Sequence, residues 1–147
     1  MLGAWFAAPV ALAVEEALKS ARADGTLAVI GHAKLAAALV KQKRDVVAVG
    51  VTERAAKKLP QALLDLSSIP DHSLAAVVGL DVATDAEWQA ALLDWTRVVR
   101  DGGAVVLVDR GHAPEASRRA LCGGLTELEQ RRTGRVIITS GLVSHLV

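Results

Sequence analysis

The stretch of residues 26–35 constrains the fold of this chain more than any other part of its sequence. It reads Thr-Leu-Ala-Val-Ile-Gly-His-Ala-Lys-Leu, so an apolar segment ends in Gly31 and helix-forming residues follow almost at once. This order predicts a buried strand at 26–30 that turns sharply into a helix at 35–41. In open α/β sheets, such a turn lies where a nucleotide is held, and glycines let the ligand approach the backbone. In this chain, the residues that follow His32 add side-chain bulk to the turn.

The composition favours a single α/β domain. The chain has 147 residues, of which 52% are hydrophobic and few are aromatic, with many Ala, Val and Leu. Parallel strands that are buried on both faces by helices have this kind of composition. We therefore expect one domain over residues 1–147, with an N-terminal helix or arm at 1–24 and an α/β core at 25–147.

Charge and cysteine content exclude several classes of partner and site. The net charge of +1 predicts binding neither to nucleic acid nor to a membrane surface. A single cysteine, Cys122, excludes an intramolecular disulfide and a cysteine-rich metal cage, and it favours a cytoplasmic location. No apolar run after the N-terminus approaches the roughly 20 residues that a membrane span needs.

The apolar N-terminus predicts an amphipathic helix in preference to a signal peptide. No Lys or Arg precedes the apolar residues 1–14, and two glutamates follow them directly. We expect the helix to start near Pro9, with Val10, Val14 and Leu18 on its buried face.

The rest of the chain alternates between strand and helix patterns and ends in a hairpin. A capping box at 84–87 predicts the start of the helix whose apolar stripe contains Trp88 and Trp95. Further strands are expected at 46–49, 62–66, 74–80 and 104–108, helices at 52–58 and 114–122, and hairpin strands at 125–131 and 135–142. These elements predict a doubly wound, mostly parallel sheet with an antiparallel C-terminal edge.

Three segments in this order resemble the class I S-adenosylmethionine-dependent methyltransferases. Residues 66–78 resemble the family's entry into its fourth strand, with a Pro-containing turn before an apolar run. Residues 93–109 resemble the helix, glycine corner and fifth strand, and residues 124–141 resemble the closing hairpin. The resemblance implies a Rossmann-like sheet with the strand order 3-2-1-4-5-7-6.

The positions that would bind the cofactor depart from the family pattern. The family's Gly-x-Gly-x-Gly turn is matched only by Gly31, followed by His32, and the acidic residue that binds the ribose is replaced by Gly50. Asp65 matches the family's acidic residue near the adenine. Charge-assisted hydrogen bonds contribute about 1.5–3 kcal/mol each, so these losses would weaken binding by about 10³-fold or more.

No catalytic motif of the family is present. The fourth strand ends in Gly-Leu-Asp-Val at 79–82, where amine methyltransferases have Asn/Asp-Pro-Pro-aromatic. The core elements also have almost nothing inserted between them that could form a substrate lid. We therefore assign no catalytic residue from the sequence.

Four polar residues follow strand ends on the edge where such sheets bind ligands, namely His32, Asp81, Asp109 and His112. One interpretation is a site for proton transfer or a metal. The other is that these side chains satisfy backbone groups or face water, as loop residues commonly do. Their spacing matches no metal-ligand motif, so no metal is expected.

The remaining groups are interpreted as structural. The basic residues are expected to be solvated helix ends and hairpin turns, with Arg44 among them, and Cys122 is expected to be a buried helix-end cysteine. Trp88 and Trp95 are expected in the core. Trp5 and Phe6 belong either to an apolar docking arm or to the packing of the first helix.

The first functional hypothesis is a methyltransferase-like pseudoenzyme that binds no cofactor and serves as a scaffold or regulatory subunit. Its partner would be a protein or a second copy of the chain. The second hypothesis is a small active methyltransferase that holds S-adenosylmethionine through Asp65 and the main chain near Gly31. The third is a binder of another small anionic ligand near His32 and Lys34.

Overall fold

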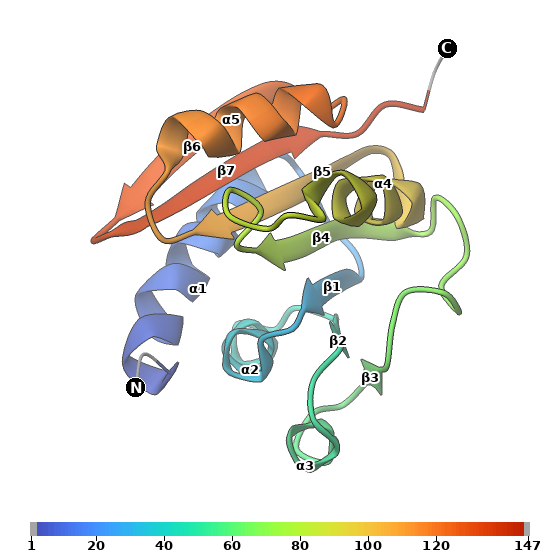
Figure 1. Ribbon diagram of the computed structural model, residues 1–147. Helices are drawn as coiled ribbons and strands as arrows, with labels where there is room; N and C mark the ends of the chain where they lie inside the picture. Colours follow the sequence, from blue (N-terminus) through green and yellow to red (C-terminus); the bar gives the residue numbers. More distant parts are fainter. Residues whose placement is uncertain (1–2, 146–147) are drawn as a thin grey trace.

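The structure is a computed structural model that describes residues 3–145, with side chains described from residue 8 onward. Helices cover both faces of a seven-stranded sheet (Figure 1). Within these residues, no helix is long and apolar enough to cross a membrane. In chain order, the elements are α1 Gly3–Ser20, β1 Leu27–Ile30, α2 Ala33–Lys41, β2 Val46–Val49, α3 Glu53–Ala56, β3 Ala62–Leu63, β4 Leu74–Leu80, α4 Trp88–Val98, β5 Val99–Asp109, α5 Ala113–Cys122, β6 Thr126–Thr133 and β7 Val136–Leu142.

The strand order is β3-β2-β1-β4-β5-β7-β6, as the resemblance implies. The strand β1 pairs in parallel with β2 and β4, and β4 pairs in parallel with β5. The hairpin strand β7 pairs antiparallel with both β5 and β6. The predicted fold class is therefore confirmed, including the antiparallel C-terminal edge.

The central strands are buried on both faces, which explains their unbroken apolar sequences. Side chains alternate across the sheet, so Val29 packs with α1 and α2, whereas Val77 packs with α4 and α5. On the α4 side, Trp95 lies directly against β4, because a Cβ atom added to Gly79 would come within 2.3 Å of its ring. Trp95 is a core residue, as predicted, whereas Trp88 is half-buried beneath the guanidinium groups of Arg118 and Arg119.

The start of α1 was predicted wrongly. The helix begins at Gly3, and Pro9 lies inside it with an exposed ring. The helix continues through the proline because Val10, Val14 and Leu18 form its buried face, and this burial outweighs one missing backbone hydrogen bond. The possible docking role of Trp5 and Phe6 concerns side chains outside the described part of the chain.

The start of α4 also differs from the prediction. The predicted capping box at 84–87 is wrong, because Trp88 begins the helix and its cap residue, Glu87, makes no capping hydrogen bond through its side chain. Instead, Asp85 Oδ1 accepts a hydrogen bond from the Glu87 amide at 2.9 Å, which forms a local turn before the helix.

Two strands differ from their predicted bounds by more than two residues. The strand β3 covers only Ala62–Leu63, because Asp65 and the residues after it form a separate turn. The strand β5 begins at Val99, directly after α4, instead of at residue 104. Its first residue pairs with Leu74, and a register shift then separates this pair from the regular ladder.

Cys122 is exposed, which contradicts the predicted burial. The helix α5 buries Ala116 and Ala120, which are four residues apart on one face. Cys122 lies two residues further along and therefore points away from that face. Gly123 makes the close approach instead, since an added Cβ atom would lie 2.8 Å from Leu92.

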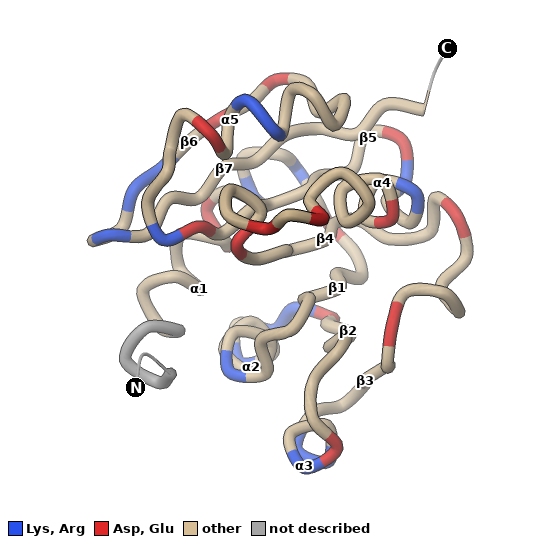
Figure 2. The backbone as a smooth tube through the Cα atoms, in the orientation of Figure 1, with Lys and Arg blue, Asp and Glu red and all other residues tan. Residues whose placement is uncertain are grey.

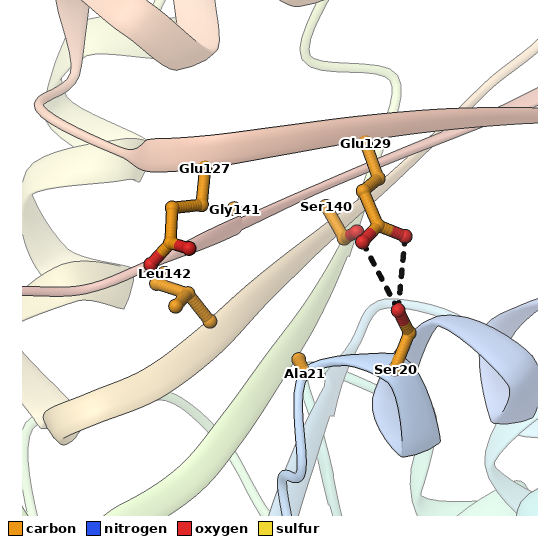
Figure 3. Close-up of a pocket in the computed structure, with 7 residues that line it drawn as sticks. All are labelled: Ser20, Ala21, Glu127, Glu129, Ser140, Gly141 and Leu142. Atoms are coloured by element: carbon orange, nitrogen blue, oxygen red, sulfur yellow. Dashed lines mark hydrogen bonds between the residues drawn. The ribbon is translucent and has the colours of Figure 1, made fainter.

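The end of α1 contacts the C-terminal hairpin around a small hollow of about 70 Å³ (Figure 3). The hydroxyl of Ser20 lies 3.0 Å from both carboxylate oxygens of Glu129, so a hydrogen bond joins the helix to β6. A hollow of this size holds a few water molecules and no nucleotide. The contact therefore serves to attach α1 to the edge of the sheet.

A nearly buried ion pair attaches α1 to the connection between α2 and β2. The Arg44 guanidinium donates to both carboxylate oxygens of Glu15 at 2.8 Å, and a third N–H donates to the Ala23 carbonyl oxygen at 2.8 Å. The two side chains are only 11% and 14% exposed. The interpretation of Arg44 as a solvated helix-end cation is therefore wrong, because the partner comes from a helix that lies far away in the sequence.

Replacing Arg44 with alanine should destabilise the fold by about 3 kcal/mol, because Glu15 would be left as an unpaired carboxylate in a nearly buried position. Urea unfolding at pH 7 measures this change. The control is Arg110→Ala, which removes a pair with Asp81 at 3.8 Å whose side chains are 60% and 47% exposed. The control should cost less than about 1 kcal/mol. Equal effects of the two substitutions would contradict the importance of the Arg44 pair.

Candidate functional site

The candidate site lies where the parallel strands β2, β1, β4 and β5 end. These strands are neighbours in the sheet, so the loops that follow them meet at one edge. Gly50 follows β2, Gly31 follows β1, Asp81 follows β4, and Asp109 is the last residue of β5. The fold therefore brings the residues predicted from four separate segments to the same edge of the sheet.

The turn after β1 keeps its first glycine for a conformational reason. Gly31 has a φ of 71°, in the left-handed region, and its amide donates to the Val49 carbonyl at 2.7 Å. A Cβ atom added to Gly31 would have no heavy atom within 4 Å. The space next to this backbone position is therefore open.

His32 caps the N-terminus of α2 with its own side chain. Its Nδ1 atom accepts a hydrogen bond from the Leu35 amide at 3.0 Å. One of the amides that the helix would otherwise present to an anion is thereby satisfied within the protein. Burial lowers the pKa of His32, which favours the neutral imidazole that this acceptor role requires.

The side chains of Lys34 and Leu35 place their bulk elsewhere. Leu35 is completely buried in the core beneath α2, whereas Lys34 is exposed and lines hollows between the helices. Of the residues after Gly31 in this turn, His32 therefore has the most direct effect on the helix N-terminus.

Gly50 occupies the position at the end of β2 where the family has its acidic residue. It has a φ of 71°, and its amide donates to the Leu63 carbonyl at 2.9 Å. A Cβ atom there would lie 3.8 Å from the Leu64 carbonyl oxygen, so there is space for a side chain, but the backbone conformation disfavours one. The local backbone is consistent with glycine, and no carboxylate is supplied at this position.

Asp65 is exposed and hydrogen-bonded within its own loop. Its Oδ1 atom accepts hydrogen bonds from the amide of Ser67, at 2.9 Å, and from the Ser67 hydroxyl. These hydrogen bonds lower the pKa of Asp65. The predicted role of Asp65 near an adenine ring stays a prediction.

Three electrostatic interactions connect the four polar residues at the strand ends. Asp81 acts on both His32 and Asp109, and His112 acts on Asp109. Asp81 and His112 have left-handed φ values of 59° and 60°, which are uncommon for residues other than glycine. No three His, Cys, Asp or Glu side chains within residues 3–145 are arranged to hold a metal ion.

Asp109 is the most unusual member of this group. It is only 1% exposed, and its Oδ1 atom accepts a hydrogen bond from the Ala83 amide at 2.9 Å. Its Oδ2 atom is buried and has no hydrogen-bond partner among the residues that the structure describes. Burial raises the pKa of Asp109, with a smaller contribution from Asp81.

Sequence reasoning missed a pair of histidines near the start of β4, at the end of this strand opposite to the candidate site. His72, just before β4, stacks on His145 with ring centroids 3.6 Å apart. His145 Nε2 lies 2.7 Å from the Val99 carbonyl oxygen, and the His145 amide donates to Asp101 at 2.8 Å. These contacts hold the C-terminal segment against the sheet. The two histidines are far apart in the sequence, and no local pattern predicts their contact.

Comparison with known structures identifies the fold. The sequence matches no protein-family model and no protein with a curated function. Its structure is similar to an assigned S-adenosyl-L-methionine-dependent methyltransferase from Methanococcus maripaludis, with a TM-score of 0.72, 15% identity, and coverage of 100% of this chain and 89% of the other. The chain has the fold of the class I S-adenosylmethionine-dependent methyltransferases.

Two further similarities involve structures that contain ligands or partners. Burkholderia thailandensis 1,6-didemethyltoxoflavin-N1-methyltransferase, solved with 1,6-didemethyltoxoflavin and S-adenosylhomocysteine, gives a TM-score of 0.75 at 11% identity, covering 94% of this chain and 79% of the other. The second structure is the complex between the Haloferax volcanii Trm112 methyltransferase activator and a protein described as a methyltransferase. Its TM-score is 0.69 at 14% identity, and the similarity covers 91% of this chain and 89% of the other.

Some methyltransferases of this fold are considerably larger. The chain spans 47% of the citrinin polyketide synthase CMeT domain and 57% of an O-methyltransferase family protein from Burkholderia thailandensis. All of these identities are low, so the similarities establish the fold and leave the activity to be inferred from the residues at the site.

Replacing Asp109 with asparagine should raise the free energy of unfolding at pH 7 to 8, because the amide keeps an acceptor for Ala83 and removes a buried negative charge. The pKa of Asp109 is higher in the folded state than in the unfolded state, so the wild-type protein gains stability as it binds this proton. The extra stability of the variant over the wild type should therefore shrink as the pH falls towards 3.8, the ordinary pKa of an aspartate. Urea unfolding at a series of pH values measures both effects.

The control for this prediction is Asp24→Asn, because Asp24 is exposed. It should change the free energy of unfolding by less than about 0.5 kcal/mol. A destabilised Asp109→Asn variant at neutral pH, or an advantage that grows as the pH falls, would contradict the interpretation of Asp109 as a buried carboxylate with a raised pKa.

Proposed function

We propose that this chain is a degenerate relative of the class I methyltransferases that binds another protein instead of S-adenosylmethionine. It would act as a scaffold or a regulatory subunit. The observation that carries this proposal is the hydrogen bond at 3.0 Å from the Leu35 amide to His32 Nδ1. A ligand that uses the N-terminus of α2 would first have to displace this imidazole.

The second support is the conformation at the end of β2. In the related methyltransferases, a carboxylate at this position binds both ribose hydroxyls, whereas this chain has Gly50 in a left-handed conformation. The missing hydrogen bonds would contribute about 1.5–3 kcal/mol each. The combination of a self-capped helix and a missing carboxylate therefore supports weak binding or none.

A protein-binding role is supported by exposed apolar side chains and by one of the similar structures. Leu12, Leu64, Leu93 and Leu121 are between 60% and 87% exposed, and they lie on different elements. Scattered apolar residues are ordinary on protein surfaces, so they support this role only together with other features. One similar structure is a methyltransferase in complex with a protein activator, so the fold is compatible with a protein partner.

The open space next to Gly31 favours a second candidate function. A small ligand could approach the backbone there, since no heavy atom lies within 4 Å of an added Cβ atom. Such a ligand could be S-adenosylmethionine held in an atypical way, or a different ligand that is a small anion and binds near His32 and Lys34. His32 and Asp81 lie within electrostatic range of each other at this edge and would contact it.

Calorimetric titration with S-adenosylmethionine and S-adenosylhomocysteine tests the proposal directly. We expect no saturable heat up to millimolar ligand, because the α2 N-terminus is capped and the ribose carboxylate is missing. Saturation at micromolar ligand would overturn the proposal and favour the second candidate. Light scattering on the same sample would report whether the chain binds a second copy of itself.

A set of variants tests which residue weakens cofactor binding. Gly50→Asp with Ala33→Gly should restore little affinity, because His32 still caps α2 in this double variant. Adding His32→Gly should raise the affinity at least tenfold, since glycine removes the imidazole and leaves the Leu35 amide free at little cost to the helix. Strong binding by the double variant would show that His32 does not hinder the cofactor.

A further inference from the structure

A groove between α1 and α2 is lined by small apolar residues and basic residues. The two helices lie side by side (Figure 1), and the hollow between them has a volume of about 560 Å³. Ala8 and Ala11 line it from α1, and Ala37 and Ala38 line it from α2. Leu12 also lines it and is 60% exposed, so an apolar side chain lies open to solvent at its border.

The groove continues towards α3. A second hollow of about 350 Å³ lies between α2 and α3 and shares Lys34 and Ala37 with the first. Leu59 and Ala55 contribute further apolar surface there. Together, the two hollows, named the α2 groove below, flank the outer surface of α2 on both sides.

The charge of the α2 groove is one-sided, although that of the whole chain is balanced. Among the described residues that line it, four are cations, namely Lys34, Lys41, Arg54 and Lys58, and none is acidic. The whole chain has 17 basic and 16 acidic residues. Figure 2 shows the basic residues along α2 and α3 in blue. Glu15, the acidic residue of α1 next to α2, is already paired with Arg44.

The surroundings of the α2 groove favour a helix as its occupant. Its walls are helices, whose backbone groups bond within each helix, so they offer no strand edge to an extended peptide. A helix satisfies its own backbone groups and can approach closely where the walls carry alanine. The nine residues of α2 extend about 13 Å, which matches roughly two and a half turns of a partner helix.

We propose that the α2 groove binds an amphipathic helix of a partner protein, with apolar residues on one face and Asp or Glu on both sides of that face. The apolar face would contact Leu12 and the alanines, and the carboxylates would pair with Lys34, Lys41 and the two cations near α3. This inference rests on the proposed protein-binding function and specifies the chemistry of the partner.

The test uses a fluorescein-labelled 15-residue peptide with Leu at positions i, i+4, i+7 and i+11 and with Glu and Ala elsewhere. Fluorescence anisotropy follows its binding to the full chain, and a scrambled peptide of the same composition is the control. We expect saturable binding of the amphipathic peptide alone, weakened at least tenfold at 0.5 M salt because ions screen the lysines. Absence of binding at low salt would overturn the proposal.

Two pairs of charge reversals locate the site. Lys34→Glu with Lys41→Glu should weaken peptide binding at least tenfold, because both residues line the groove. Lys19→Glu with Lys57→Glu makes the same change in net charge at exposed residues that line neither hollow, and it should change the affinity less than threefold. Equal effects of the two pairs would show that the peptide is attracted by the overall charge of the chain and not by the groove, and this would overturn the proposal.

Two further measurements separate the remaining explanations. Leu12→Asp should weaken peptide binding at least tenfold, and the peptide should slow hydrogen exchange in residues 8–12 and 34–42. If the wild-type chain is a dimer by light scattering and Leu12→Asp makes it a monomer, a second copy occupies the groove and the proposal is wrong. Cofactor binding in calorimetry together with peptide binding would refute the proposed function and leave the groove inference standing.

Discussion

The two-sided burial of the central parallel strands is the constraint on which the rest of this structure depends. Because β1, β2 and β4 expose almost no side chains, helices must cover both faces of the sheet, and every crossover must return to the same end. This arrangement brings Gly31, Gly50 and Asp81 to one edge. It also requires α1 to pack on the sheet, where the pair of Glu15 with Arg44 holds it.

At the ends of β1 and β2, the residues that would bind a cofactor differ from the family pattern, although the backbone fold is the same. The backbone turns after β1 and β2 both retain glycines in the left-handed conformation. The first of these turns is followed by an imidazole that bonds to the helix N-terminus itself, and the second supplies no carboxylate. Polar groups remain at the edge, among them the buried Asp109, whose raised pKa reflects burial with one oxygen unpartnered. The α2 groove proposed for protein binding begins beside this edge, because Lys34 lines it.

The sequence by itself determined where most of the strands lie, whereas the order of the strands and the departure from the cofactor pattern followed from its resemblance to the methyltransferases. The runs at 46–49 and 74–80 are predicted to the residue, because strands buried on both faces are continuously apolar and end at Gly or Asp. Gly31 and Gly50 could be recognised as site positions because they directly follow such strands. Local sequence was sufficient wherever a property depends on residues that are neighbours along the chain.

Only the tertiary structure decided properties that depend on distant partners. Arg44 looks like a solvated helix end until α1 brings Glu15 to it, and Cys122 looks buried until α5 turns Ala116 and Ala120 inward. The α2 groove combines three helices in one surface. In each case the deciding energy is that of a contact between segments, and a sequence pattern contains no information on which segments meet.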